Sequence, residues 1–259
     1  MRLERVIVAF GITAALFSAA VPVVGQAGGA AGNRAEVSRP WPPNHLPDGQ
    51  PDVQGIWAAA AGGSTSLTNP IDGQADFDRH VTGADPRVPS RVIDPPDGLI
   101  PYQPWAAARQ KQQAQDYDHP TKPEHFDTQH RCLLSGVPRL YYIVPAFKII
   151  QPPGSVVFIW DEYHAYRVIP LDGHPHVGPN LKLWMGDARG HWEGNTLVID
   201  TTNVKGARLT YMGDFYSDNA HVVERITFAD ANNMNYEATI DDPTVYTRPW
   251  TLRVAERRR

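Results

Sequence analysis

A turn followed by an alternating run at residues 190–202 constrains the fold of this chain more than any other stretch. Glu193-Gly194-Asn195 precedes the run, in which Leu197, Ile199 and Thr201 alternate with Thr196, Val198 and Asp200. A period of two residues is that of a β-strand with two differently solvated faces. Gly and Asn tolerate the positive φ that a tight hairpin turn requires. We therefore expect a β-hairpin within an antiparallel sheet.

Strand-like segments of this kind occupy most of the C-terminal half of the chain. They are expected at residues 147–151, 156–163, 164–171, 181–185, 196–202, 221–229, 234–241 and 244–254, and Gly55-Ile56-Trp57 marks a further one near the N-terminus. Turn residues such as Pro152-Pro153-Gly154 and Asp172-Gly173 separate them. Short strands at a spacing of roughly ten residues are typical of sandwiches and barrels. The sequence predicts a mainly β fold, an antiparallel β-barrel or sandwich, as a single domain over residues 53–259.

The first 27 residues have the pattern of an export signal peptide. Arg2 and Arg5 form the positive region, Val6 to Ala20 the apolar region, and Gly25-Gln26-Ala27 fits the small-x-small cleavage rule. The alternative is a membrane anchor, but the apolar run is shorter than the roughly 20 residues that a span requires. We expect a periplasmic or extracellular protein with no stable membrane span after signal removal.

Two irregular segments precede the dense strands. Residues 28–52 are rich in Gly, Ala, Pro and Asn and are expected to form an extended N-terminal arm. Residues 62–146 are expected to be an irregular excursion, whose turn-rich part at 62–103 is either a lid or a wrap over the body. Within it, Pro104 begins one helix that ends before His119-Pro120, because Pro is favoured in the first helical turn and good helix formers follow. We expect this helix on the surface of the sheet.

Charge and cysteine content exclude several classes of function. The formal net charge is −4, so no overall basic field is present to hold nucleic acid. Cys132 is the single cysteine, which excludes an internal disulfide and a cysteine-type zinc site. It is either a buried small hydrophobe or a reactive thiol. His174 and His176 lack an obvious third ligand, so neither a metal nor another cofactor is predicted.

Five motifs resemble those of a large, mostly uncharacterised family of exported bacterial proteins. They are Pro51–Trp57, Arg131-Cys132-Leu133 with Gly136-Val137-Pro138-Arg139, Gly190–Thr201, His221–Arg225, and Asp241-Asp242-Pro243 with Tyr246–Thr251. This resemblance implies export but no particular activity. Gly55-x-Trp57 at the first strand, followed by an antiparallel meander, is also similar to lipocalin-like barrels, from which the long segment at 62–146 departs.

Four residues are candidates for acid–base chemistry. Glu162 and His164 are two residues apart, so they share a face if their strand is unbroken, and a carboxylate beside an imidazole sets its tautomer. The alternative is an exposed turn at Asp161–His164. His221 and Arg225 share one face of the strand at 221–228, opposite Glu224, and that face is expected to line a ligand cavity. The alternative for Arg225 is an ion pair on the outside.

Two functions from different classes follow from these assignments. The first is an exported barrel that binds a small apolar or aromatic ligand in its interior, against aromatic walls formed by Tyr166, Tyr236, Tyr246 and Trp250. The last three are equally well explained as ordinary core. The second is a cofactor-independent lyase, isomerase or hydrolase that uses Glu162, His164, His221 and Arg225 around the same pocket. The sequence does not distinguish these functions or fix the oligomeric state.

Overall fold

The computed structural model describes residues 43–60, 67–68, 90–143 and 146–259. The predicted signal peptide, residues 28–42 of the predicted arm, and most of the turn-rich part at 62–89 lie outside the described residues. The end of the arm packs on the body, because the side-chain amide of Gln151 donates to Gln50 Oε1 over 3.2 Å and Gln151 Oε1 accepts from the backbone of Val53.

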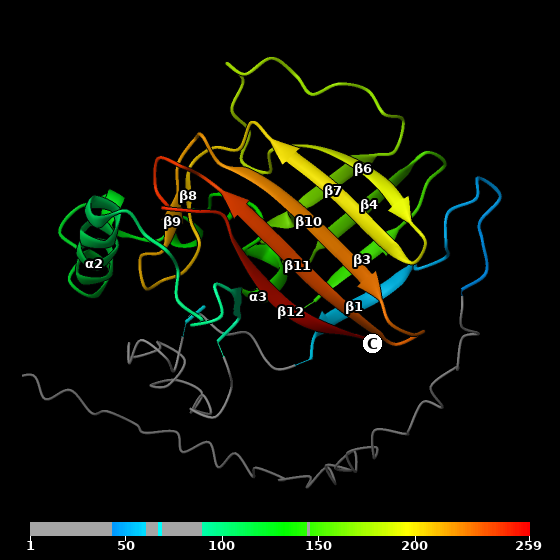
Figure 1. Cartoon of the computed structure of the whole chain (residues 1–259), viewed down its shortest axis with the longest axis horizontal. Helices are drawn as coiled ribbons and strands as arrows, with labels where there is room; N and C mark the ends of the chain where they lie inside the picture. Colours follow the sequence, from blue (N-terminus) through cyan, green and yellow to red (C-terminus); the bar gives the residue numbers. More distant parts are fainter. Residues whose placement is uncertain (1–42, 61–66, 69–89, 144–145) are drawn as a thin grey trace, which may run out of the picture. The chain divides into compact units, whose positions relative to one another are not determined.

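Nine antiparallel strands form a nearly closed barrel-like sheet (Figure 1). They are β1 (Gly55–Ala59), β3 (Phe147–Ile150), β4 (Ser155–Trp160), β5 (Tyr166–Pro170), β6 (Asp187–Glu193), β7 (Thr196–Thr202), β10 (His221–Phe228), β11 (Asn233–Asp241) and β12 (Trp250–Arg258). Their order is β5-β4-β3-β1-β12-β11-β10-β7-β6, and β2 (Val92–Asp94) pairs with β12. The predicted mainly β, antiparallel fold is confirmed.

The barrel closes between β5 and β6 by side-chain packing, because these two edge strands are not hydrogen-bonded to each other. Gly190 of β6 faces Ile169 of β5, and a Cβ at Gly190 would lie 2.6 Å from the Ile169 Cγ2 atom. A larger residue would therefore separate the two edges.

The predicted hairpin is β6–β7, with Glu193 opposite Thr196 and the turn residue Gly194 at φ 58°. Three other strand predictions were wrong in whole or in part. The strand expected at 244–254 begins only at Trp250, as β12. Residues 181–185 form no strand, and Leu183 makes only an isolated bridge to Val204. The segment 156–163 is broken, because β4 ends at Trp160 and the chain reverses through η3 (Glu162–His164) before β5.

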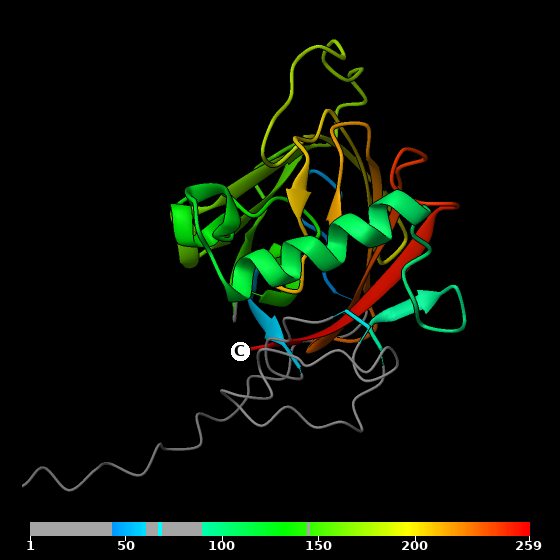
Figure 2. The same ribbon diagram turned by 90° about the vertical axis from the view of Figure 1, so that its left-hand side faces the viewer.

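A cap covers one end of the barrel. It consists of α2 (Pro104–Asp118), the two-stranded sheet of β8 (Ala207–Arg208) and β9 (Phe215–Tyr216), and the short helices η1 (Pro123–His125), η2 (Gln129–Arg131) and α3 (Leu140–Ile143). In Figure 2, α2 runs across the end of the barrel beside β8 and β9. The predicted helix is confirmed, and the Gln110 side-chain amide fixes it by donating to the Met212 carbonyl over 2.6 Å. No helix among the described residues is long and apolar enough to cross a bilayer.

A buried ion pair lies inside the barrel. Arg167 of β5 contacts Glu224 of β10 through two bonds, Nη1 to Oε1 at 2.9 Å and Nη2 to Oε2 at 2.6 Å. The hydroxyls of Tyr236 and Thr201 also donate to this carboxylate, at 2.8 and 3.1 Å. Burial disfavours the charged guanidinium, but Glu224 more than offsets this and holds the pKa of Arg167 above its ordinary value. The carboxylate is therefore compensated, as a buried charge must be.

A second buried carboxyl has no such compensation. Glu256 of β12 is 1% exposed, and neither of its side-chain oxygens has a hydrogen-bond partner in the described structure. Burial raises its pKa to about 8, and the attraction of Arg91 offsets only part of this effect. Glu256 is therefore protonated in the folded protein over much of the neutral range.

Removing one partner of the interior ion pair is expected to destabilise the barrel strongly. Arg167→Met leaves the Glu224 charge buried without its counter-ion, which costs about 3–5 kcal/mol of unfolding free energy. The double variant Arg167→Met/Glu224→Leu removes both charges and should recover at least half of that loss. Urea denaturation at pH 7 measures both values, and a single variant as stable as the wild type would refute the compensation argument.

Glu256 is expected to make the folded state less stable as pH rises. The unfolded carboxyl ionises near its ordinary pKa of 4.5, whereas the folded one stays protonated to about 8, so the unfolded chain releases a proton first. The contribution of Glu256 to the free energy of unfolding is fully present below pH 4.5. It is lost as the pH rises towards 8, by up to about 1.4 kcal/mol per pH unit. Glu256→Gln should therefore match the wild type at pH 5 and exceed it at pH 8 in urea unfolding. Parallel pH profiles of the two proteins would contradict this.

Candidate functional site

A cleft of about 740 Å³ lies in the cap, between α2 and the β8–β9 sheet. Its lining brings together two parts of the chain that are far apart in sequence. From the first come Trp105, Arg109, Gln113, Glu124, Thr128, Arg131 and Leu133, and from the second Trp184, residues 205–208 and residues 215–219. Four aromatic side chains, Trp105, Trp184, Phe215 and Tyr216, are among them.

The helix α2 supplies one wall of the cleft. Trp105 and Arg109 are four residues apart, so they lie on one face of the helix. The indole of Trp105 donates to the Thr244 carbonyl over 3.1 Å, and its ring meets that of Phe215 edge-on with 6.1 Å between centroids. The Arg109 guanidinium lies 4.9 Å from the centre of the Phe215 ring. These contacts hold the wall in place and leave Trp105 47% exposed.

Tyr216 of β9 connects the cleft with the barrel interior. Tyr216 is among the lining residues of the cleft although it is only 1% exposed, and its hydroxyl is buried with no hydrogen-bond partner within the described ranges. Burial raises the pKa of this hydroxyl well above its usual range, and both Arg167 and Glu224 are close enough to affect it. The Tyr216 hydroxyl is therefore affected by the charges of the interior ion pair.

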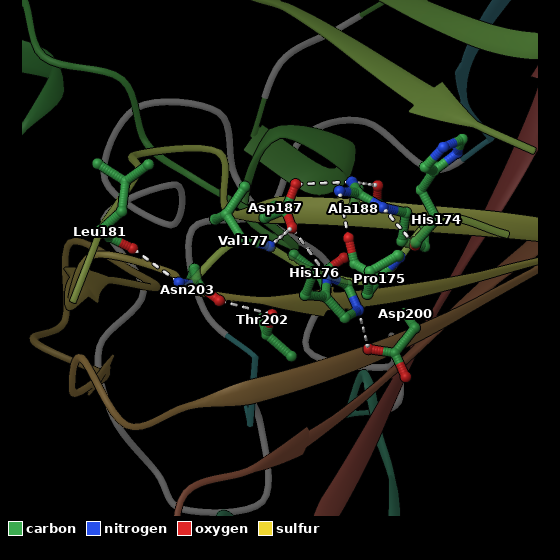
Figure 3. Close-up of polar contacts among 12 residues, drawn as sticks. His174, Pro175, His176, Val177, Leu181, Asp187, Ala188, Asp200, Thr202 and Asn203 are labelled. Carbon is green, nitrogen blue, oxygen red and sulfur yellow. Dashed lines mark hydrogen bonds and ion pairs between the residues drawn. The ribbon is translucent and has the colours of Figure 1, made fainter. Parts of the chain in front are cut away.

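The loop at 171–186 includes Trp184 of the cleft lining. Figure 3 shows the polar contacts that fasten this loop to residues of β6 and β7 and to Asn203. His176 lies between two carboxylates, with Nδ1 at 3.0 Å from Asp187 and Nε2 at 3.3 Å from Asp200. The side-chain amide of Asn203 donates to the carbonyls of Gly178 and Leu181, at 2.8 and 2.9 Å. The loop is therefore anchored by several polar contacts before the chain reaches the cleft wall.

The cleft is positively charged although the whole chain is acidic. Arg109, Arg131, Lys205 and Arg208 face two carboxylates, Glu124 and Asp218, which gives the lining a formal charge of +2 against −4 for the chain. Charges that line a concave surface act together on an incoming ligand. The cleft therefore attracts anions more than the rest of the surface does.

Glu162 and His164 lie in η3, at the reversal between β4 and β5, and not on a strand. Tyr163 and His164 have positive φ angles of 60° and 48°, so the alternation that would place Glu162 and His164 on one face is interrupted. The strand-borne pair was therefore a wrong prediction, and the turn that was its alternative is present. His164 is exposed.

His221 and Arg225 lie on the outer face of the barrel. His221 Nε2 is 2.9 Å from Asp200 Oδ1, and the Arg225 guanidinium donates to Glu193 Oε2 over 2.8 Å. The prediction that their face lines a cavity was wrong, because Val222, Glu224 and Ile226 are the residues of β10 that point inward. The external ion pair of Arg225 is the alternative that the structure supports.

The four predicted wall residues do not line the cleft in the described structure. Tyr166 is 67% exposed on β5, so it lies outside the barrel. Tyr236, Tyr246 and Trp250 are buried, and the two tyrosine hydroxyls donate to Glu224 and to the Phe215 carbonyl. These three belong to the core, which sequence reasoning had left as an equal possibility.

Two further features concern the exposure of Cys132 and the arrangement of possible metal ligands. Cys132 is exposed, so the buried alternative was wrong. Across the described ranges, no group of three or more His, Cys, Asp or Glu side chains is arranged to hold a metal ion. The residues that do form a concave site were missed, since Trp184 was assigned to a strand and Arg208 and Tyr216 carried no motif.

Gly136 packs closely against two residues of the cleft lining, Trp184 and Tyr216. It has φ +71°, and a Cβ there would lie 2.9 Å from both the Trp184 carbonyl and the Tyr216 hydroxyl. Gly136→Ala should destabilise the protein by about 2 kcal/mol or more, through both backbone strain and collision. Gly154 is the matched control, because it also has φ +71° but nothing within 4 Å of a Cβ. Thermal unfolding should show a clearly larger loss for Gly136→Ala than for Gly154→Ala, and equal losses would refute the close approach.

Comparisons with known proteins do not assign a function to this chain, so the geometry of the cleft is the basis for a proposal. The chain gave no match to protein-family models, to curated proteins or to solved structures. The resemblance of its motifs to exported bacterial proteins therefore stays a prediction. The function must be argued from the cleft itself.

Proposed function

We propose that this protein is an exported binding protein that holds a small aromatic molecule in the cleft between α2 and the β8–β9 sheet. The observation that carries the proposal is the aromatic lining of a cleft of about 740 Å³, formed by Trp105, Trp184, Phe215 and Tyr216. Small-molecule sites are usually clefts of about 300–1,000 Å³ with mostly apolar or aromatic walls and a few polar groups. The export signal predicted from the sequence supports a role outside the cytoplasm.

The cleft is a better candidate than the barrel interior, where the ligand was first expected. Tyr141 stacks on Tyr236 with 3.8 Å between ring centroids, and Tyr141 also meets Trp160 edge-on at 5.4 Å. Side chains packed in this way occupy the space that an interior ligand would need. The cleft instead keeps Trp105 half-exposed, so a ligand ring has an aromatic surface to cover.

The enzymatic alternative has weaker support. His221 and Arg225 are already paired with Asp200 and Glu193 on the outer face of β7 and β10 and the β6–β7 turn. Glu162 and His164 belong to the separate reversal at η3. A binding function requires only the cleft and its lining residues.

Removal of an aromatic wall is expected to weaken binding. Trp105→Ala should reduce the affinity for uncharged one- and two-ring aromatics such as indole and 2-naphthol by about tenfold, because each aromatic contact contributes about 1 kcal/mol beyond the area it buries. Isothermal titration calorimetry measures this directly. Tyr166→Ala is the control, since Tyr166 is exposed but distant from the lining residues, and it should bind as the wild type does. Equal affinities in all three proteins, or no binding to the wild type, would refute the proposal.

A further inference from the structure

Arg208 is a buried cation without a counter-ion at the edge of the cleft. Its side chain lines the cleft, and the residue is only 8% exposed. Its Nη1 atom is buried with no hydrogen-bond partner, and no carboxylate within the described part of the chain forms an ion pair with it. Burial lowers the pKa of the Arg208 guanidinium, and Asp127 offsets only part of this effect. An uncompensated buried charge is unfavourable unless another group pairs with it.

The nearest buried carboxylate is already engaged by another arginine. Arg139 is fully buried and donates through Nη1 to Asp127 Oδ2 over 2.9 Å and to the backbone carbonyl of Arg208 over 3.2 Å. Asp127 Oδ1 also accepts from the backbone N–H of Gln129 over 3.0 Å. Asp127 is therefore bound by Arg139, and Arg208, which lines the cleft, has no ion-pair partner in the described structure.

The side-chain atoms without hydrogen-bond partners near Arg139 and Arg208 can act as donors. Arg139 Nε and Nη2 and Gln129 Nε2 are buried without partners in the described structure, as is the Tyr216 hydroxyl. Each such group carries a desolvation penalty that an acceptor would remove. Among these residues Arg208 lines the cleft, and because its unpartnered Nη1 is a donor, an oxyanion is the kind of ligand group that would pair with it.

We propose that Arg208 binds the acidic group of the ligand, so that the molecule held in the cleft is an aromatic acid. This inference rests on the proposed binding function and adds the chemical class of the ligand. The ring would contact the aromatic walls while a carboxylate or phosphoryl group accepts hydrogen bonds from Arg208. Arg109, Arg131 and Lys205 line the same cleft and add attraction for an anion. A neutral ligand would leave the Arg208 charge buried and unpaired, so it should bind more weakly than the corresponding acid.

Matched ligands test this assignment on the full chain. Calorimetric titration with 2-naphthoate, 2-naphthyl phosphate and the neutral 2-naphthamide should show at least one acid bound about tenfold or more tightly than the amide, as for a hydrogen bond to a charged group. The tighter of the two acids identifies the oxyanion. The preference should also weaken as salt is raised, because an ionic attraction is screened.

Arg208→Met should abolish the preference for the acid while leaving the affinity for 2-naphthamide within about threefold of the wild type. Its urea midpoint should be equal to or higher than that of the wild type, because the substitution removes an unpaired buried charge. Arg225→Met, at an exposed arginine on the outer face, is the control and should keep the preference.

The outcomes separate the two proposals. Equal binding of acid and amide that is still weakened by Trp105→Ala overturns the role of Arg208 and leaves the binding function intact. A marked loss of stability in Arg208→Met, with the acid preference unchanged in that variant, also overturns it, because Arg208 would then be a structural residue. No binding of any of the three compounds overturns both proposals.

Discussion

The bond between Arg167 and Glu224 is the interaction on which closure of the barrel depends. The two edge strands β5 and β6 are not hydrogen-bonded to each other, so the backbone alone leaves the sheet open. Arg167 extends from β5 past this seam and reaches Thr201 on β7 and Glu224 on β10. The ion pair therefore joins the two ends of the sheet from inside, in an environment where an electrostatic bond is strong and an unpaired charge is costly.

The same arrangement determines where a ligand site is available. Large side chains such as Trp160 and Tyr236 fill the region around the ion pair, so the concave surface lies in the cap. Tyr216 belongs to both regions, since it is among the lining residues of the cleft and its hydroxyl lies near the charges of the interior. Arg167 and Arg208 show two uses of a buried arginine. Arg167 is paired with Glu224, whereas Arg208 has no ion-pair partner in the described structure and lines the cleft.

Much of the fold was accessible from the sequence because its signals are local. The alternation at 196–202 and the Gly194-Asn195 turn specify the β6–β7 hairpin, and Pro104 specifies the start of α2. The sequence left the segment after Trp160 open, because Glu162–His164 is compatible with either a strand or an exposed turn. The turn is present, and the positive φ angles of Tyr163 and His164 depend on the tertiary reversal between β4 and β5.

The site was less accessible because its parts are distant in the chain. Trp105 and Arg208 meet only after α2 has packed across the β8–β9 sheet, and neither belongs to a motif of fixed spacing. The face of β10 was also assigned the wrong way round, since His221 and Arg225 were expected to line an interior cavity and Glu224 to lie opposite them. Glu224 can point inward only because Arg167, which lies 57 residues earlier, compensates its charge.

The seam between β5 and β6 has a consequence for the motions of this protein. Elsewhere in the barrel, a change in diameter would break rows of backbone hydrogen bonds. At the seam it would separate only side chains, such as Ile169 from the backbone of Gly190. Regions held by fewer backbone bonds open at lower free energy than the global unfolding transition. Transient opening of the barrel is therefore expected along the seam between β5 and β6. The ion pair between Arg167 and Glu224, which spans this seam from inside, limits how far the two strands separate.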